Sequence, residues 1–103
     1  MTHHELLAWL DARRPAPPAA LRAHLEAAAT GSDERLPEHL ADIGGALVSR
    51  VARHLHSGRE LALDLLAADA FVTYAFEAQA EADVTQLAAL ADRVTAGRRR
   101  YTT

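Results

Sequence analysis

The chain has 103 residues, of which 50% are hydrophobic and 24% charged, with a formal net charge of −3 and no cysteine. This length suits a single domain, because two domains would each approach the size at which a hydrophobic core no longer suffices. The absence of cysteine excludes a disulfide framework, a thiolate-bound zinc ion, an iron–sulfur cluster and a cysteine nucleophile. The apolar fraction is too high, and the net charge too small, for a disordered chain.

The sequence carries no pattern typical of membrane insertion or export. Charged residues interrupt every apolar run before it reaches the roughly 20 residues that a membrane-spanning helix needs. The first residues, Met-Thr-His-His-Glu, show no basic stretch leading into an apolar one, which a secretory signal requires. All eleven basic residues are arginine, a bias that indicates a GC-rich genome. We therefore expect a cytoplasmic protein from a bacterium.

The first half of the chain predicts three helices. Thr2 and Glu5 form a capping box at the start of a first helix that runs to about Arg14. Three prolines at 15, 17 and 18 stop this helix, and the last of them suits the first turn of a second helix ending near Gly31. A third helix is predicted from Leu36-Pro37-Glu38 to about His56, since proline and an acidic residue favour a helix start.

The second half predicts two more helices. Ser57 and Glu60 form another capping box, so a fourth helix is expected to begin after a break at Ser57-Gly58 and to run to about Ala82. Asp83 with Gln86 opens a fifth helix that ends at Gly97. The sequence thus predicts one bundle domain over residues 1–97 and a frayed basic tail over residues 98–103.

The fourth helix is apolar nearly all round, which is typical of a helix enclosed by others. One side carries Leu61, Leu65, Val72 and Phe76, while Leu63 and Tyr74 lie opposite. We therefore predict an all-α fold, a compact antiparallel bundle of four to five helices with helix 58–82 at its centre. Truncating Phe76 or Leu65 to alanine is expected to cost roughly 2–5 kcal/mol.

The third helix has an apolar stripe that includes a glycine. The stripe consists of Leu36, Leu40, Ile43, Leu47 and Val51, and Gly44 lies on the same side. This glycine either lets another helix approach closely or, together with Gly45, marks a bend. The sequence leaves both readings open.

Three polar residues are the candidates for a ligand pocket or for buried polar groups: Asp69, Tyr74 and His54. If Asp69 is buried, it must be paired, for example with Arg50 or Arg53, or have a raised pKa, because an isolated carboxylate in a core is very costly. The alternative is a narrow solvated strip along the helix. Histidines at the edge of a core, such as His54 and His24, are expected to bond to the backbone or to a carboxylate.

No sequence motif supports catalysis, a cofactor or a metal ion. His54 and His56 are two residues apart and would point to nearly opposite sides of a helix. The Glu-x-x-His and His-Glu-x-x-His spacings do not occur, and neither does a Gly-x-Ser-x-Gly elbow or a phosphate-binding glycine loop. We expect a non-catalytic protein without a metal or cofactor.

One segment of ten residues resembles part of a known enzyme family. Residues 68–77, Ala-Asp-Ala-Phe-Val-Thr-Tyr-Ala-Phe-Glu, are similar to a helix of trans-isoprenyl diphosphate synthases, commonly Gly-Asp-Ala-Leu-Leu-Thr-x-Ala-Phe-Glu. Those enzymes bind magnesium and diphosphate through two aspartate-rich motifs, which this chain lacks. The resemblance implies shared packing of a buried helix, and no activity is carried over.

The leading functional hypothesis is a helical interaction, adaptor or regulatory module that acts as a homodimer or with a protein partner. The apolar supply exceeds what five short helices can bury, and the proposed interface residues are Trp9, Leu10, Leu90 and Val94. One alternative is a bundle that binds a small apolar ligand. Another is a weak contact with an anion or nucleic acid through Arg98, Arg99 and Arg100, although the acidic net charge argues against nucleic acid.

Overall fold

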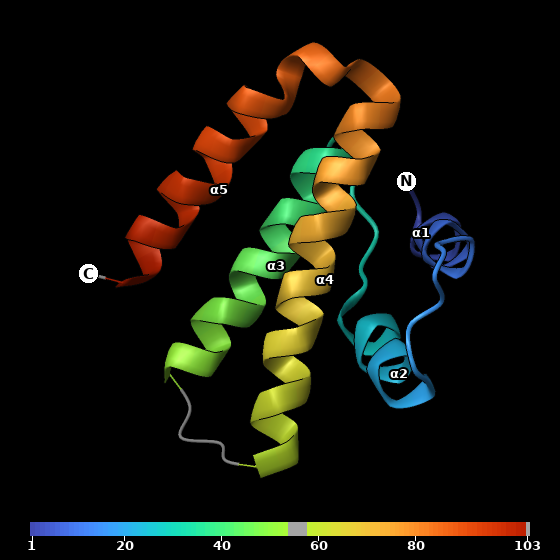
Figure 1. Cartoon of the computed structure of the whole chain (residues 1–103), viewed down its shortest axis with the longest axis vertical. Coiled ribbons are helices and arrows are strands. Elements are labelled where there is room, and N and C mark those ends of the chain that lie inside the picture. The colour runs from blue at the N-terminus through green and yellow to red at the C-terminus, as the bar shows by residue number, and fades with distance from the viewer. Residues whose placement is uncertain (54–57, 103) are drawn as a thin grey trace.

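The fold consists of α-helices joined by short connections (Figure 1). The computed structural model describes residues 1–53 and 58–102, with side chains up to residue 96. Its elements in chain order are α1 (His3–Asp11), α2 (Ala19–Ala28), α3 (Leu36–Arg53), α4 (Gly58–Asp83), the 3-10 turn η1 (Val84–Gln86) and α5 (Leu87–Thr102). No strand occurs in these described ranges. The prediction of an all-α fold is confirmed.

The longest helix, α4, is the centre of the bundle. It lies antiparallel beside α3, while α5 turns back from the far end of α4 and runs along the other side of α3 (Figure 1). The short helices α1 and α2 lie on the opposite side of α4 from α5. Because α4 contacts α2, α3, η1 and α5, helix 58–82 is the element on which the bundle is built, but the other helices do not enclose it: Leu65 and Leu66 are about half exposed on its outer side.

The helix boundaries follow the local signals of the sequence, although α1 ends at Asp11 and α2 at Ala28, each three residues before its predicted end, and with one larger exception. At α1, the backbone N–H of Glu5 donates to Thr2 Oγ1 at 3.1 Å and that of Thr2 donates to Glu5 Oε1 at 2.8 Å, so the predicted capping box is present. Residue 57, half of the second predicted box, lies outside the described residues. The exception is α5, which continues past Gly97 to Thr102, because a lone glycine inside a helix costs only about 1 kcal/mol.

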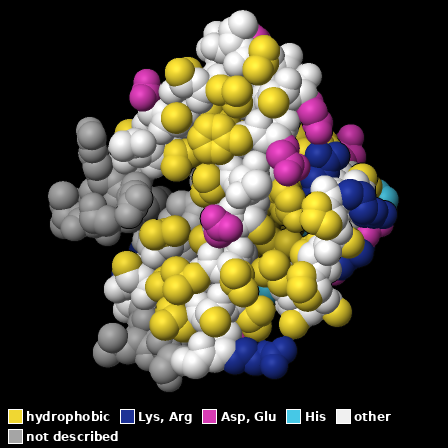
Figure 2. Space-filling model, in the orientation of Figure 1, with side chains coloured by type: hydrophobic (Ala, Val, Ile, Leu, Met, Phe, Trp, Pro, Cys, Tyr) yellow, Lys and Arg dark blue, Asp and Glu magenta, His cyan; other side chains and the backbone are white. Residues whose placement is uncertain are grey.

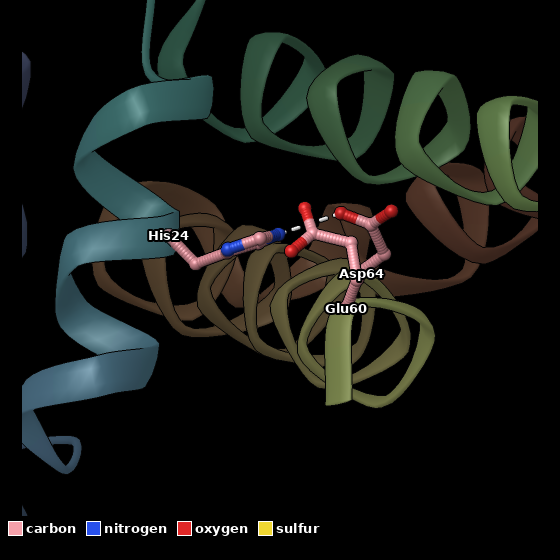
Figure 3. A group of neighbouring side chains, drawn as sticks. All are labelled: His24, Glu60 and Asp64. Atoms are coloured by element: carbon pink, nitrogen blue, oxygen red, sulfur yellow. Dashed lines mark hydrogen bonds and ion pairs between the residues drawn. The ribbon is translucent and has the colours of Figure 1, made fainter. Parts of the chain in front are cut away.

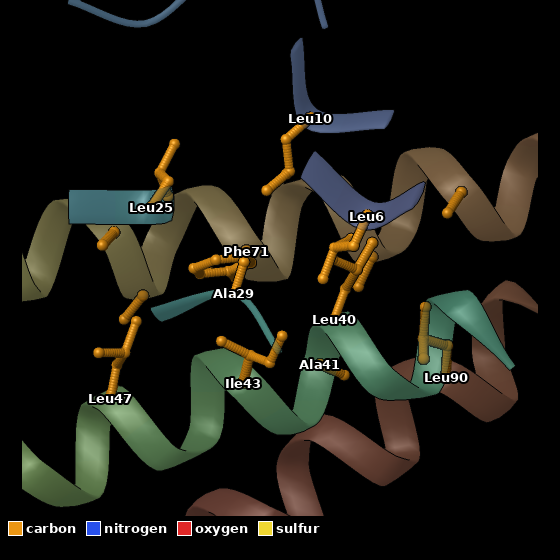
Figure 4. Packing of buried hydrophobic residues seen from close by; sticks show 14 residues of the cluster. Leu6, Leu10, Leu25, Ala29, Leu40, Ala41, Ile43, Leu47, Phe71 and Leu90 are labelled. Atoms are coloured by element: carbon orange, nitrogen blue, oxygen red, sulfur yellow. The ribbon is translucent and has the colours of Figure 1, made fainter. Parts of the chain in front are cut away.

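The core lies where α3 and α4 meet and where α1 and α2 cover them (Figure 4). In α3 the predicted stripe points inward, with Leu40, Ile43 and Leu47 buried. Gly44 brings the two helices together: a Cβ atom there would lie 2.9 Å from Val72 Cγ2 and 3.2 Å from the carbonyl oxygen of Ala68. The close-approach reading of this glycine is therefore correct, and α3 runs unbroken through it.

The buried face of α4 differs from the predicted one. It is made mainly of small residues around one aromatic ring, and its apolar members are Ala67, Ala68, Phe71, Ala75 and Ala78. Leu65 is 49% exposed and Phe76 only half-buried. The prediction that Leu65 is a core residue is wrong, because α3 approaches α4 on the side of Ala68, Phe71 and Val72. The predicted stripe of larger side chains, which includes Leu65 and Phe76, lies to one side of the contact between α3 and α4.

None of the helices in the described ranges is both long and apolar enough to span a membrane.

Candidate functional site

The most distinctive polar feature is a buried carboxylate on α4. Asp64 is 2% exposed, and its Oδ1 atom lies 2.6 Å from Nε2 of His24 and 3.2 Å from Nη2 of Arg50. The imidazole comes from the middle of α2 and the guanidinium from the last turn of α3. A single acidic group therefore joins three helices of the bundle.

The position of Asp64 explains why it is buried. Ala67, Ala68, Phe71 and Ala75 follow it at intervals of three, four, seven and eleven residues, so all five share one face of the helix. The α3–α4 contact buries this face. Asp64 thus lies on the alanine-rich face that meets α3, one turn beyond the exposed start of α4.

The surroundings of Asp64 favour its charged form. The hydrogen bond from His24 lowers the pKa of Asp64, and the positive charge of Arg50 lowers it further; burial acts in the opposite direction without reversing the effect. A buried carboxylate is tolerated only when paired and hydrogen-bonded. His24 fulfils the expectation that a histidine at the core edge bonds to a carboxylate.

A second carboxylate lies beside this pair. Glu60 is on α4 one turn before Asp64, and Figure 3 shows its side chain extending toward the carboxylate of Asp64 while His24 approaches from α2. Each of the three side chains offers one atom that could bind a metal ion, an imidazole nitrogen or a carboxylate oxygen, and these three atoms lie within 4.8 Å of one another. Glu60 is exposed. The three side chains, which we call the His24–Glu60–Asp64 cluster, therefore connect the buried ion pair to solvent.

Sequence reasoning missed this cluster because its members are distant in the chain. His24 and Asp64 are 40 positions apart, so no local motif joins them. The available signal was the presence of one acidic residue on the alanine-rich face of α4. The predicted pairing of Asp69 with Arg50 or Arg53 is not found, because Arg50 pairs with Asp64 instead.

Asp69 does not have the buried role that the sequence left open. It is exposed, and neither a hydrogen bond nor an ion pair joins its side chain to the described residues. The solvated-strip reading is correct because Asp69 is five residues after Asp64, which turns it about 140° away from the buried face.

Tyr74 packs against the first helix. Its ring lies 6.0 Å from the ring of Trp9 in an edge-to-face arrangement, and the guanidinium of Arg13 lies 3.9 Å from the centre of the Trp9 ring. Burial is the main reason why the pKa of Tyr74 is raised. Aromatic and cation–π contacts of this kind stabilise a helix interface, so Tyr74 and Trp9 hold α1 against α4.

Neither Asp69 nor Tyr74, two of the three proposed polar groups, lines the groove that the structure shows. His54 lies outside the described residues. This open groove of about 530 Å³ runs between α2 and α3. Its walls carry the side chains of His39, Asp42 and Arg50 together with apolar residues.

Two of the four predicted interface residues are unavailable to a partner. Leu10 is 8% exposed and Leu90 3% exposed, and both belong to the core of the single chain. Trp9 and Val94 are half-buried and pack against the same core. The expectation of an interface centred on Leu10 and Leu90 is corrected, since the two terminal helices use these side chains to dock onto α3 and α4.

The exposed apolar surface lies instead on α4. The side of this helix that faces away from α3 carries one series of residues, which we call the outer flank of α4: Arg59, Ala62, Leu65, Leu66, Asp69, Thr73, Phe76 and Glu77. Leu65 is 49% and Leu66 52% exposed. Figure 2 shows hydrophobic side chains gathered over the face of the molecule along which α4 runs.

The basic end of the chain belongs to α5. The side chains of Arg98, Arg99 and Arg100 lie outside the described residues, although the helix itself runs through them. Arg93, one turn earlier, pairs with Asp42 at 2.8 Å and with Glu34. Its charge is therefore used to fasten α5 to α3.

Comparisons with protein-family models, with curated proteins and with solved structures find no match to this chain. Any function must therefore be argued from the residues themselves.

Proposed function

We propose that the protein is a helical interaction module that forms a homodimer through the outer flank of α4. The observation that carries this proposal is the exposure of two adjacent leucines, Leu65 and Leu66, on the central helix of the bundle. Single exposed leucines are common on protein surfaces, but a contiguous apolar patch indicates a binding surface. Half-buried Phe76 extends the patch along the same helix.

The charges of the outer flank favour a second copy of the same chain in antiparallel orientation. Arg59 and Glu77 lie on the same side of α4, because their separation of 18 positions spans five turns, about 27 Å. When two copies pack antiparallel about a two-fold axis, Arg59 of each subunit faces Glu77 of the other. Within one chain, Arg13 pairs with both Glu77 and Glu81. One positive charge therefore faces two negative charges, and the Glu77 end of the outer flank keeps a net negative charge.

The same arrangement places the leucines at the centre of the interface. With Arg59 facing Glu77, the two-fold axis passes near residue 68, so Leu65 and Leu66 of both copies meet beside it. Buried side chains near the middle of an interface contribute most of its binding energy. The flank thus combines an apolar centre with opposite charges at its two ends.

Analytical ultracentrifugation over a range of micromolar concentrations tests the proposal. We expect the wild-type chain to sediment as a dimer and the double variant Leu65→Gln/Leu66→Gln to sediment as a folded monomer. Val84→Gln is the matched control, because Val84 is an apolar residue outside the flank that is even more exposed (61%) than the two leucines. A wild-type chain that stays monomeric, or a double variant that still dimerises, contradicts the proposal.

A charge-reversal cycle tests the orientation. Arg59→Glu and Glu77→Arg are each expected to weaken the dimer, and the combined variant is expected to restore it, since opposite charges again face each other. Circular dichroism of each variant checks that the fold is retained. Equal dimerisation by all four proteins would refute the antiparallel arrangement while leaving the leucine test to decide the interface itself.

A further inference from the structure

The His24–Glu60–Asp64 cluster has the composition of a metal site. Three side chains from two helices each direct one ligand-type atom into a common space, with these atoms within 4.8 Å of one another (Figure 3). Glu60 and Asp64 are four residues apart on α4, so their carboxylates lie on one face of the helix. The imidazole of His24 closes the group from α2.

The formal charges in the cluster are not balanced. Glu60 and Asp64 carry two negative charges when ionised, whereas Arg50 is the only arginine bonded to Asp64 among the side chains that the structure describes. Asp64 is 2% exposed and already paired, whereas the second carboxylate, Glu60, is exposed to solvent. Two carboxylates on one face of a helix attract a divalent cation by their charge. A divalent cation held between them would offset both negative charges once Arg50 has turned away.

From this geometry we propose that His24, Glu60 and Asp64 form a binding site for a divalent transition-metal ion of the Zn²⁺ type. One imidazole nitrogen and two carboxylate oxygens match the ligands that zinc accepts, whereas Mg²⁺ and Ca²⁺ prefer oxygen alone. Three protein ligands leave the fourth tetrahedral position for water, and exposed Glu60 lies on the solvent side of the cluster.

The required movements are small. Zinc binds nitrogen and oxygen at about 2.0–2.2 Å, so two tetrahedral ligand atoms lie about 3.4 Å apart. The His24–Asp64 pair must therefore open from its present 2.6 Å, while Glu60 moves inward. Arg50 must release Asp64, and its side chain is 47% exposed, so it can turn into solvent. The metal would replace the hydrogen bond that now joins α2 to α4.

Isothermal titration calorimetry with ZnCl₂ alone tests this site. We expect one saturable ion per wild-type chain, with the affinity reduced roughly 100-fold or more in Glu60→Gln and in His24→Gln, beyond what loss of a supporting group alone costs. Glu60 is exposed, so its variant keeps the fold even if His24→Gln does not. The matched control is His3→Gln/His4→Gln, which removes two exposed histidines near the N-terminus and is expected to bind Zn²⁺ like the wild type.

Two further measurements have readouts that an ion pair alone would not produce. Co²⁺ in place of Zn²⁺ is expected to give the visible absorption of a tetrahedral complex, and this absorption should disappear in Glu60→Gln. The melting temperature should rise with Zn²⁺, return to its starting value with a chelator, and lose its metal dependence on acidification, because the ligands must be deprotonated. Absence of saturable binding to the wild type, or equal binding by Glu60→Gln, overturns the proposal.

Discussion

The assignment of the two apolar sides of α4 can be tested by comparing Phe71→Ala with Leu65→Ala. Phe71 is fully buried in the contact between α3 and α4, whereas Leu65 is 49% exposed. The sequence pattern alone treats Leu65 as core, so the two substitutions separate that reading from the structure.

The expected costs follow from burial. Phe71→Ala removes a buried ring and leaves a cavity, which costs about 3–5 kcal/mol. A domain of this length has a total stability of about 5–15 kcal/mol, so this variant loses about a fifth of it or more. Burying a leucine completely contributes about 1.5–3 kcal/mol. Leu65→Ala should therefore cost no more than about 1 kcal/mol, because solvent already covers half of the side chain and no cavity forms.

Urea unfolding followed by far-UV circular dichroism measures both values, at protein concentrations low enough for every variant to be monomeric. The denaturant midpoint should fall far more for Phe71→Ala, with an unchanged m-value. If Phe71→Ala fails to fold, Phe71→Leu replaces it in the comparison of stabilities. This variant keeps most of the side-chain volume and should cost about 1–1.5 kcal/mol. A Leu65→Ala cost as large as that of Phe71→Ala would refute the placement of the two sides of α4.

Three more predictions follow from single contacts. The pKa of Asp64 is lowered in the folded state, so ionisation of this carboxyl stabilises the fold above its unfolded pKa of about 3.9. This contribution is lost as the pH falls toward the folded pKa. In urea unfolding at decreasing pH, Asp64→Asn should therefore lose less stability below about pH 4 than the wild type does. Gly44→Val should lower the stability by about 1–3 kcal/mol in the same assay, because its Cβ would already lie 2.9 Å from Val72 Cγ2; an unchanged midpoint would show that the helices do not approach closely there. Asp69→Asn should tighten the proposed dimer in sedimentation experiments, since the two-fold axis passes near this carboxylate and brings it close to its own copy; weaker association would contradict the register.

The sequence determined the elements of this protein because their signals are local. A capping box needs only Thr2 and Glu5, a stop needs only the prolines at 15, 17 and 18, and the stripe of α3 needs only its own spacing. These signals act within one or two turns, so they can be read without the fold. The same reasoning placed the close-approach glycine on the correct side of α3.

Tertiary packing decided which side of α4 is buried and which acid is paired. On a helix that is apolar nearly all round, periodicity cannot choose between the larger side chains near Leu65 and the alanines around Phe71, because both satisfy the same spacing. The choice depends on how closely α3 can approach, and the absence of a side chain at Gly44 allows contact with the alanine side. That contact buries Asp64, brings His24 to it from 40 residues away, and leaves Leu65 and Leu66 in solvent.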